Sequence, residues 1–533
     1  MAQRTPKHFQ VRWWLVRLWL GLMMPVIVYA SDEPLQTAKV CQYMQCNVNE
    51  NDGAQLRLRF NHTMWKQYSG SLNQEFDFTS WSWSELDSVA EANPTLEVTF
   101  NGLEVPHVDI LQGHDGVVIL NLDENKITVV EAEAFVNFKM LTVLSLRRNM
   151  ITAVNELFYV PNKLQRLDLS NNWISEINGF KSFTWVELRH LNLSHNRIES
   201  LRTELSKLDA LDTLDLSHNS IKKVDSKPII LSRSLRRLLL DHNKLTAWPF
   251  DSLPDTLDEL SLSFNELETT KEGHHVRHLD LSSNRLTSFC GHCYPALEEL
   301  DLSGNYFDTI PKLSNATGNS IRKVSFNRMP NLQSMEKTAF EGAANLQEIE
   351  ISFCPRLSYI EPHAFTDLKQ LKRLDLSYNA LQQVPEDMVH WKQITQGVDL
   401  QGNPFNCNCS MQWFVSKVIP AMHSNRELHK LFPKLRCAEP PMYKDYLLVY
   451  LTVHDNLLCR KYREMDLPGM EQVVQLMREH RQMQMVRAQK IILACLIVGI
   501  IAMSLYLAYL KLNRPRYRVR PIYYQLPRIC ACE

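Results

Sequence analysis

Hydrophobic and polar positions follow one recurring phrase along this chain, apolar-x-x-apolar-x-apolar-x-x-Asn. The phrase occurs fourteen times between Asn101 and Asn403, at intervals of 19 to 25 residues. LQRLDLSNN, which ends at Asn172, and LDTLDLSHN, which ends at Asn219, are two of its plainest copies. A period held over this length predicts a solenoid in which every turn repeats one structural unit.

Each copy of the phrase predicts one short β-strand followed by a turn. Because side chains alternate along a strand, Leu167 and Leu169 should face the core while Asp168 faces solvent. No single turn can bury its apolar side alone, so the stacked strands should form one concave parallel β-sheet. The predicted fold is therefore an α/β solenoid, a leucine-rich repeat horseshoe with disulfide-bonded end caps.

The recurrent Asn should lie where the chain leaves each strand, with its amide hydrogen-bonded to backbone groups of the turn. Met329 and Cys354 replace this Asn in two turns. We interpret Cys354 as a buried structural thiol, because the repeat pattern accepts cysteine at this position.

The two ends of the chain carry targeting patterns. Residues 1–30 indicate a signal peptide, because an apolar run flanked by Arg12 and Arg17 ends in Val-Tyr-Ala. Residues 491–510 contain no charge, are long enough for one transmembrane helix and are followed at once by basic residues. These patterns predict a type I single-pass protein of the plasma membrane with an extracellular N-terminal part. The net charge of −1 gives no indication of nucleic-acid binding.

Cysteine usage fits an oxidising compartment, since nine of the twelve cysteines lie between Cys41 and Cys459. Cys41 and Cys46 should form a disulfide that closes the exposed first turn, before a strand-like segment at 55–60. Two further disulfides are expected near the end of the array, where spacing alone leaves three connectivities open. Their cysteines are Cys407, Cys409, Cys437 and Cys459.

The string from Phe289 to Cys293, Phe-Cys-Gly-His-Cys, is spelled like the active site of protein disulfide isomerases. It lies inside the array, without the strand and long helix that such a site needs. We therefore predict a local disulfide between Cys290 and Cys293 and no enzyme activity, with a luminal thiol oxidoreductase as a remote alternative. These cysteines also resemble a zinc cluster, but secretion favours the disulfide, so no metal site and no cofactor are expected. The histidines of that cluster would be His274, His275, His278 and His292.

The outward-facing residue between the inner leucines of each turn is acidic in eight of the fourteen phrases and basic in none. Adjacent strands lie ~4.8 Å apart, so several of these carboxylates should be close like charges. They could form an acidic groove for a polar or basic partner. Alternatively, Asp is simply a common residue at this strand position, and its charge is solvated there. The eight are Glu97, Asp168, Asp215, Asp280, Asp301, Glu350, Asp375 and Asp399.

A second column of residues comes just before the Asn of each turn. Three consecutive turns place His195, His218 and His242 there. Histidines so spaced should resist full protonation, although their recurrence could equally be an ordinary variation of the repeat sequence. Exposed aromatic residues in this column would suit a protein contact. The candidate ligand-binding site on the concave face therefore combines the seven acidic residues from Asp168 onward with Phe264, Phe353 and Tyr378.

Short motifs complete the picture. Sequons for glycosylation occur at Asn61, Asn192, Asn315 and Asn408. The juxtamembrane part of the chain indicates a helical stalk whose heptad pattern is short, so a homo- or heterodimer stays open. The tail is below the ~40 residues that fold unaided, and Tyr523 to Leu526 look like a tyrosine-based sorting signal.

From about Asn93 to Cys459 the chain resembles the extracellular part of Toll-type and other insect-style leucine-rich repeat receptors. Its layout is similar to that of the transmembrane members of the mosquito leucine-rich immune molecules. The run from Asn403 to Cys409, with the cysteines after it, resembles the cysteine-rich cap of such arrays. This resemblance implies the pairs Cys407–Cys437 and Cys409–Cys459. The chain departs from the family in having two cysteines in its N-terminal cap where many relatives have four.

The resemblance implies the following order along the chain: signal peptide (1–30), N-terminal cap (31–92), about fourteen repeats (93–403), cysteine-rich cap (404–459), helical stalk (460–490), transmembrane helix (491–510) and cytoplasmic tail (511–533). The function it implies is innate immune recognition of a protein ligand or co-receptor through the concave face. A cell-adhesion or neuronal wiring receptor uses the same architecture and stays open as the alternative. No nucleic-acid partner is expected.

Overall fold

The computed structural model describes residues 41–459 except 42–43, 50–54, 61–63, 65–77, 79–80, 91–94, 155–162, 182–184, 202–203, 225–231, 251, 314–319, 392–393, 395–396, 424–433 and 454–456. The predicted signal peptide, stalk, transmembrane helix and sorting signal, and the sequons at Asn61 and Asn315, lie outside the described residues. Among the helices of the described part, none has the length and apolar character needed to cross a bilayer.

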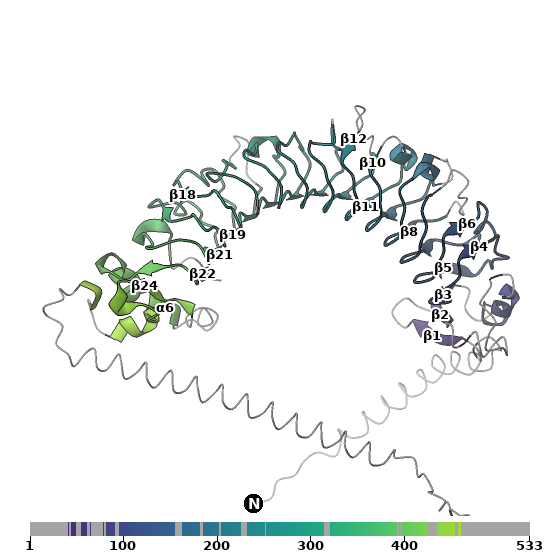
Figure 1. Cartoon of the computed structure of the whole chain (residues 1–533), viewed down its shortest axis with the longest axis horizontal. Coiled ribbons are helices and arrows are strands. Elements are labelled where there is room, and N and C mark those ends of the chain that lie inside the picture. The colour runs from purple at the N-terminus through teal and green to yellow at the C-terminus, as the bar shows by residue number, and fades with distance from the viewer. Residues whose placement is uncertain are drawn as a thin grey trace, which may run out of the picture.

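One sheet of sixteen strands lines the inner side of an arch (Figure 1). Its first two strands form an antiparallel hairpin, and from β2 onward every neighbouring pair is parallel. Fourteen strands follow the hairpin, one for each expected repeat. In spatial order the sheet contains β1 (Gln45–Asn49), β2 (Gln55–Phe60), β3 (Leu96–Phe100), β5 (Val117–Asn121), β7 (Val143–Ser145), β8 (Arg166–Asp168), β9 (His190–Asn192), β11 (Thr213–Asp215), β13 (Arg237–Leu239), β14 (Glu259–Ser261), β15 (His278–Asp280), β16 (Glu299–Asp301), β17 (Lys323–Ser325), β19 (Glu348–Glu350), β21 (Arg373–Asp375) and β22 (Gly397–Asp399).

Short elements connect one inner strand to the next. Three small parallel pairs lie on the outer side of the arch (Figure 1): β4 (His107–Val108) with β6 (Val129–Val130), β10 (Ser200–Leu201) with β12 (Lys223–Val224), and β18 (Ser334–Met335) with β20 (Tyr359–Ile360). The helical turns of the array are η2 (Trp83–Leu86), α5 (Asp87–Ala90), η3 (Asn178–Lys181), η4 (Glu204–Lys207), η5 (Gly291–Cys293) and η6 (Glu386–Met388). The α/β solenoid expected from the sequence is confirmed.

The apolar positions of the phrase form the core. Leu167 and Leu169 are fully buried and Asp168 between them is half-buried on the sheet face, as the alternation predicts. The recurrent Asn is buried as well. Asn305, for example, is 0% exposed, and its amide nitrogen donates to the carbonyl oxygens of Leu281 and Leu302 at 2.9 Å each. From Asn125 onward, each Asn of the column therefore fastens its own turn to the preceding one.

Cys354 takes over this role in its turn. Its thiol accepts a hydrogen bond from the Met329 amide at 3.4 Å and donates one to the Phe326 carbonyl at 3.3 Å. The side chain is fully buried, and this burial raises the pKa of the Cys354 thiol to about 11. The interpretation as a buried structural thiol is confirmed.

The register at the start of the array differs from the expectation. β3 pairs with β5 so that Thr99 lies opposite Asn121, while Glu97 lies opposite Ile119. Thr99 therefore occupies the outward column between the inner apolar residues, and the assignment of Glu97 to that column was wrong. The turn keeps its expected place, because the Leu103 amide donates to Asn125 as the Ile127 amide donates to Asn149. The strand is therefore offset from its own turn in the segment after Phe100, which a fixed phrase cannot show. Glu97 instead accepts a hydrogen bond from Arg57 at 2.6 Å.

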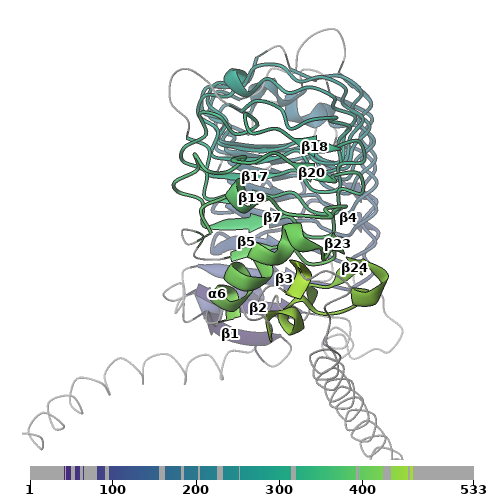
Figure 2. The ribbon, with the colours of Figure 1, turned by 90° about the vertical axis from the view of Figure 1, so that its left-hand side faces the viewer.

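Both ends of the sheet are covered by caps. At the N-terminal end the disulfide Cys41–Cys46 joins β1 to the residue Cys41 that precedes it, and the side chains of Trp81 and Trp83 pack edge-on against Phe100. At the C-terminal end the disulfides Cys407–Cys437 and Cys409–Cys459 join the pairs that the family resemblance implied. This cap lies across the end of the stack (Figure 2) and contains β23 (Phe405–Asn406), η7 (Cys409–Met411), η8 (Phe414–Val418), α6 (Ile419–His423), β24 (Cys437–Glu439), η10 (Pro441–Tyr443), η11 (Leu448–Val453) and η12 (Leu457–Cys459).

Candidate functional site

A hollow of about 370 Å³ lies on the concave face over strands β13 to β19. Its wall contains five carboxylates, one lysine and one histidine, which gives it a negative charge at neutral pH. Three of the predicted site residues, Asp280, Asp301 and Glu350, lie in this hollow. Its remaining charged or titratable residues come from the neighbouring outward column: Glu259, His278, Glu299 and Lys323.

Sequence reasoning missed this neighbouring column as part of the site. In a strand, residues two apart share a face, so Glu299 lies on the same side as Asp301. Reading both outward columns of each phrase would have placed Glu299 on the same face, although not in the same hollow.

The Asp residues of the central column also have a local structural role. One oxygen of Asp280 accepts a hydrogen bond from the Ser282 amide at 2.9 Å, and Asp301 does the same with Ser303 at 2.8 Å. Asn192 makes an equivalent bond to the Ser194 amide at 2.9 Å with a neutral amide oxygen. The turn therefore accepts a neutral oxygen at this position, and even Leu239 in β13, so it does not need the negative charge.

The carboxylates in the hollow are close enough to disfavour one another's ionisation. Asp280 and Asp301 are direct partners in neighbouring strands. Burial raises the pKa of Asp301, and the charges of Asp280 and Glu350 raise it further. Farther along the sheet, burial and the neighbouring Asp375 raise the pKa of Asp399 in the same way. The expected like-charge contacts are present.

Basic side chains compensate this charge only partly. Arg373 approaches Glu350 with a nitrogen-to-oxygen distance of 4.0 Å. Arg237 forms a salt bridge of 2.5 Å with Glu259, and both residues belong to the neighbouring outward column. This pair neutralises one of the acids in the hollow wall. The remaining predicted acids lie on either side of the hollow, Asp168 and Asp215 toward the N-terminal cap and Asp375 and Asp399 toward the C-terminal cap.

Parts of the column just before each Asn form stacks of rings. All its non-glycine residues from Glu124 to Tyr378 have a positive φ, between 51° and 58°, which fixes the direction of their side chains. The rings stack at 4.1 Å between His195 and His218, 4.0 Å between His218 and His242, and 4.2 Å between His242 and Phe264. The sequence placed these residues in one column but did not indicate that Phe264 continues the histidine stack.

A second stack lies nearer the C-terminal cap. The rings of Phe353 and Tyr378 are 4.6 Å apart and nearly parallel, and their residues are 50% and 43% exposed. Phe264 is 49% exposed. The predicted aromatic residues therefore form two separate exposed groups along one edge of the sheet.

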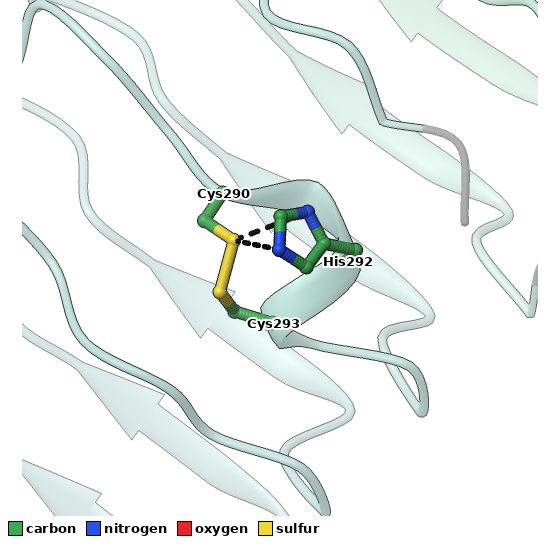
Figure 3. A group of neighbouring side chains, drawn as sticks. All are labelled: Cys290, His292 and Cys293. Atoms are coloured by element: carbon green, nitrogen blue, oxygen red, sulfur yellow. Dashed lines mark hydrogen bonds between the residues drawn. A yellow bond between two sulfur atoms is a disulfide. The ribbon is translucent and has the colours of Figure 1, made fainter. Parts of the chain in front are cut away.

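The Phe-Cys-Gly-His-Cys string forms a closed loop (Figure 3). Cys290 and Cys293 are joined by a disulfide across the three-residue turn η5, with the His292 ring nitrogen 3.2 Å from the Cys290 sulfur. A β-carbon at Gly291 would come within 2.6 Å of the Lys312 carbonyl oxygen, which explains the glycine. The predicted local disulfide is present, so these cysteines are not thiolates that could bind zinc.

Two sequons lie in the described part of the chain. Asn192 is half-buried on the sheet face, where its side-chain oxygen accepts from the Ser194 amide and hydroxyl. Asn408 is exposed in the C-terminal cap, and its oxygen accepts from the Ser410 amide at 2.9 Å. Glycosylation at either residue stays a prediction.

The repeats match the family model described as Leucine rich repeat over residues 115–174, 186–245, 324–381 and 344–405. Two shorter leucine-rich repeat models match residues 274–288 and 296–316. Together with the one-strand-per-turn sheet and the buried Asn column, these matches show that the array consists of leucine-rich repeats.

Individual relatives are more distant. Tsukushi from Mus musculus is 29% identical over 173 residues, which cover 30% of this chain and 47% of that protein. This chain therefore spans about half the length of that relative. Among solved structures, the TLR13–ssRNA13 complex superposes with a TM-score of 0.50 at 19% identity, covering 67% of this chain and 57% of that one. The LRIM1/APL1C complex gives a TM-score of 0.44 at 18% identity, covering 80% and 70%.

Proposed function

We propose that this chain is a type I single-pass protein of the plasma membrane that binds a basic protein ligand or co-receptor through its concave face. The disulfides in both caps support an oxidising, extracellular location for the array. In this proposal the uncharged residues 491–510 form the transmembrane helix, and the basic residues that follow them lie on its cytoplasmic side.

The acidic hollow carries the proposal. Asp280, Asp301 and Glu350 converge there with raised local negative potential, and the turn geometry alone does not require their charge. A lysine- or arginine-rich protein segment would relieve this repulsion on binding, which favours both affinity and rapid encounter. The phosphates of a nucleic acid would increase the repulsion instead, so we favour a protein over the kind of ligand named in the TLR13 complex.

The exposed aromatic pair supplies the apolar part of such an interface. Phe353 and Tyr378 follow the strands that carry Glu350 and Asp375, so rings and carboxylates are neighbours along one edge. Aromatic side chains are typical anchors of protein interfaces, and their acidic neighbours would suit a basic partner by charge complementarity. The immune role rests on the similarity of the layout to the mosquito immune molecules.

The test displays the full chain on cells and captures surface-bound proteins by chemical crosslinking. The variant is Asp280→Asn with Asp301→Asn, because Asn192 shows that an amide preserves the turn. The matched control is Asp255→Asn, whose carboxylate is 91% exposed and outside the hollow. We expect the double variant to retain about tenfold less ligand, roughly 1.4 kcal/mol, and the control to retain all of it.

The expected loss should also appear when salt is raised, since exposed charges are screened within ~8 Å at physiological ionic strength. Equal capture by the wild type and the double variant would contradict the acidic hollow as the binding site. Recovery of a small molecule in place of any protein would overturn the proposed mechanism.

A further inference from the structure

The stacked histidines bring together side chains that are far apart in sequence. His195, His218 and His242 follow the adjacent parallel strands β9, β11 and β13, and their φ angles of 54°, 53° and 54° are nearly identical. Adjacent turns therefore repeat the same side-chain direction at the strand spacing. The three imidazole rings therefore stack on one another, and the exposed ring of Phe264 stacks on His242 at one end of the row.

Asp241 adds a carboxylate to this stack. Its oxygen lies 3.1 Å from the Nδ1 atom of His242. One donor atom from each of His218, Asp241 and His242 lies within 4.8 Å of the other two. His218 and Asp241 are half-buried, and the His242 side chain is 40% exposed. Two imidazoles and one carboxylate at this separation are a donor set that transition metals of the zinc class prefer.

We propose that His218, Asp241 and His242 bind one divalent transition-metal ion of the zinc class at the edge of the concave face. Ligand atoms on a tetrahedral zinc ion are about 3.4 Å apart, as bonds of about 2.0–2.1 Å require. Binding requires the rings of His218 and His242, which stack 4.0 Å apart with 17° between their planes, to turn so that one nitrogen of each points at the ion. Three protein ligands leave the fourth position open to water or to a side chain of a binding partner.

Two other clusters of the described residues lack this combination. Cys290 and Cys293 are consumed by their disulfide. The His107 cluster has one imidazole, and the same Nε2 atom already contacts Asp109 at 3.1 Å and Glu131 at 3.2 Å, all at exposed positions. The proposal departs from the sequence-based expectation that the chain has no metal site.

The test uses the full chain in detergent micelles, purified without a histidine tag and stripped with a chelator. Cobalt(II) is titrated first, because a four-coordinate cobalt site with nitrogen and oxygen ligands absorbs visible light strongly. Zinc is then added to displace the cobalt and give its own affinity. We expect one equivalent of cobalt to bind with this spectrum and one equivalent of zinc to abolish it.

His218→Asn is the first variant, because Asn171 already adopts the same left-handed conformation in this column with φ of 56°. Asp241→Asn is the second and leaves the ring stack in place. The matched control is His275→Asn, which removes an exposed histidine that also faces a carboxylate, that of Asp255 at 3.4 Å. Circular dichroism of each variant checks that the fold is unchanged.

Both site variants should bind zinc at least about tenfold more weakly than the wild type, and the control should bind it equally well. Unchanged zinc affinity in either His218→Asn or Asp241→Asn would overturn the assignment. Loss of the cobalt spectrum in His275→Asn would overturn it too, since the metal would then lie elsewhere. None of these outcomes depends on the protein ligand of the concave face.

Discussion

Replacing one buried Asn should weaken the array more than any change at its surface. Asn305→Ala removes two bonds from the amide nitrogen, to the carbonyls of Leu281 and Leu302, and one from the Leu286 amide to the side-chain oxygen at 3.0 Å. The residue is 0% exposed, so no solvent replaces these bonds directly. Three backbone groups in two consecutive turns lose their partner.

The magnitude follows from the cost of leaving buried polar groups unpaired. That cost is about 1–3 kcal/mol per group, so the low end for three groups is about 3 kcal/mol. Water that enters the cavity would recover part of the loss, which is why the low end is used. A loss of about 3 kcal/mol corresponds to roughly 100-fold in the local opening equilibrium.

Hydrogen exchange followed by mass spectrometry measures that equilibrium directly. Peptides from residues 281–305 should exchange about 100-fold faster in the variant under conditions where opening is at equilibrium, while peptides from β5 and β7 keep their protection. Global melting reports this opening of two adjacent turns less directly, because cooperativity can fail along a repeat array. A change in exchange below about tenfold would refute the view that the Asn column fastens the turns together.

Asn305→Cys serves as the graded control. The chain itself shows that a buried thiol at this position both accepts and donates, with longer bonds of 3.4 and 3.3 Å at Cys354. Thiol hydrogen bonds are weak, so the Cys variant should lose protection but less than the Ala variant. Equal loss in both would mean that volume, and not hydrogen bonding, determines the effect.

Two further predictions concern the concave edge. Gly402→Ala places a β-carbon 2.4 Å from the Tyr378 ring at a φ of +74°, so it should cost about 1–3 kcal/mol by thermal melting, and Tyr378→Ala should relieve part of that cost. Asp301→Asn should raise the melting temperature at pH 7 by about 1–2 °C, the effect of about 1 kcal/mol of like-charge repulsion in an array this large. The pKa of Asp301 in the folded wild type is raised above 3.8, so the wild type loses stability as the pH rises through that pKa and Asp301 ionises. Near pH 3 Asp301 is protonated in both the folded and the unfolded state, so the stability gain of the Asn variant should vanish there. A variant that melts lower than wild type at pH 7 would contradict the sign.

The sequence predicted which strand face most of the site residues occupy, but not which of them lie close together. The period assigned Asp280, Asp301 and Glu350 to one face correctly, because alternation along a strand is a local property. It could not show that Glu299 and Lys323 complete the same hollow, since this depends on how strongly the stacked turns curve. The seven acids therefore looked like one uniform row, whereas the structure gathers three of them in the hollow and leaves two on each side of it.

The sequence by itself determined the repeat, the buried leucines, the Asn column and the thiol of Cys354, because each follows from hydrogen bonding and burial within one turn. Only the tertiary structure decided the register of β3, which moved Glu97 out of its expected column, and the contact of His242 with both Asp241 and Phe264. These features depend on the offset between one turn and the next. That offset is set by packing across the whole stack, and no single copy of the phrase contains it.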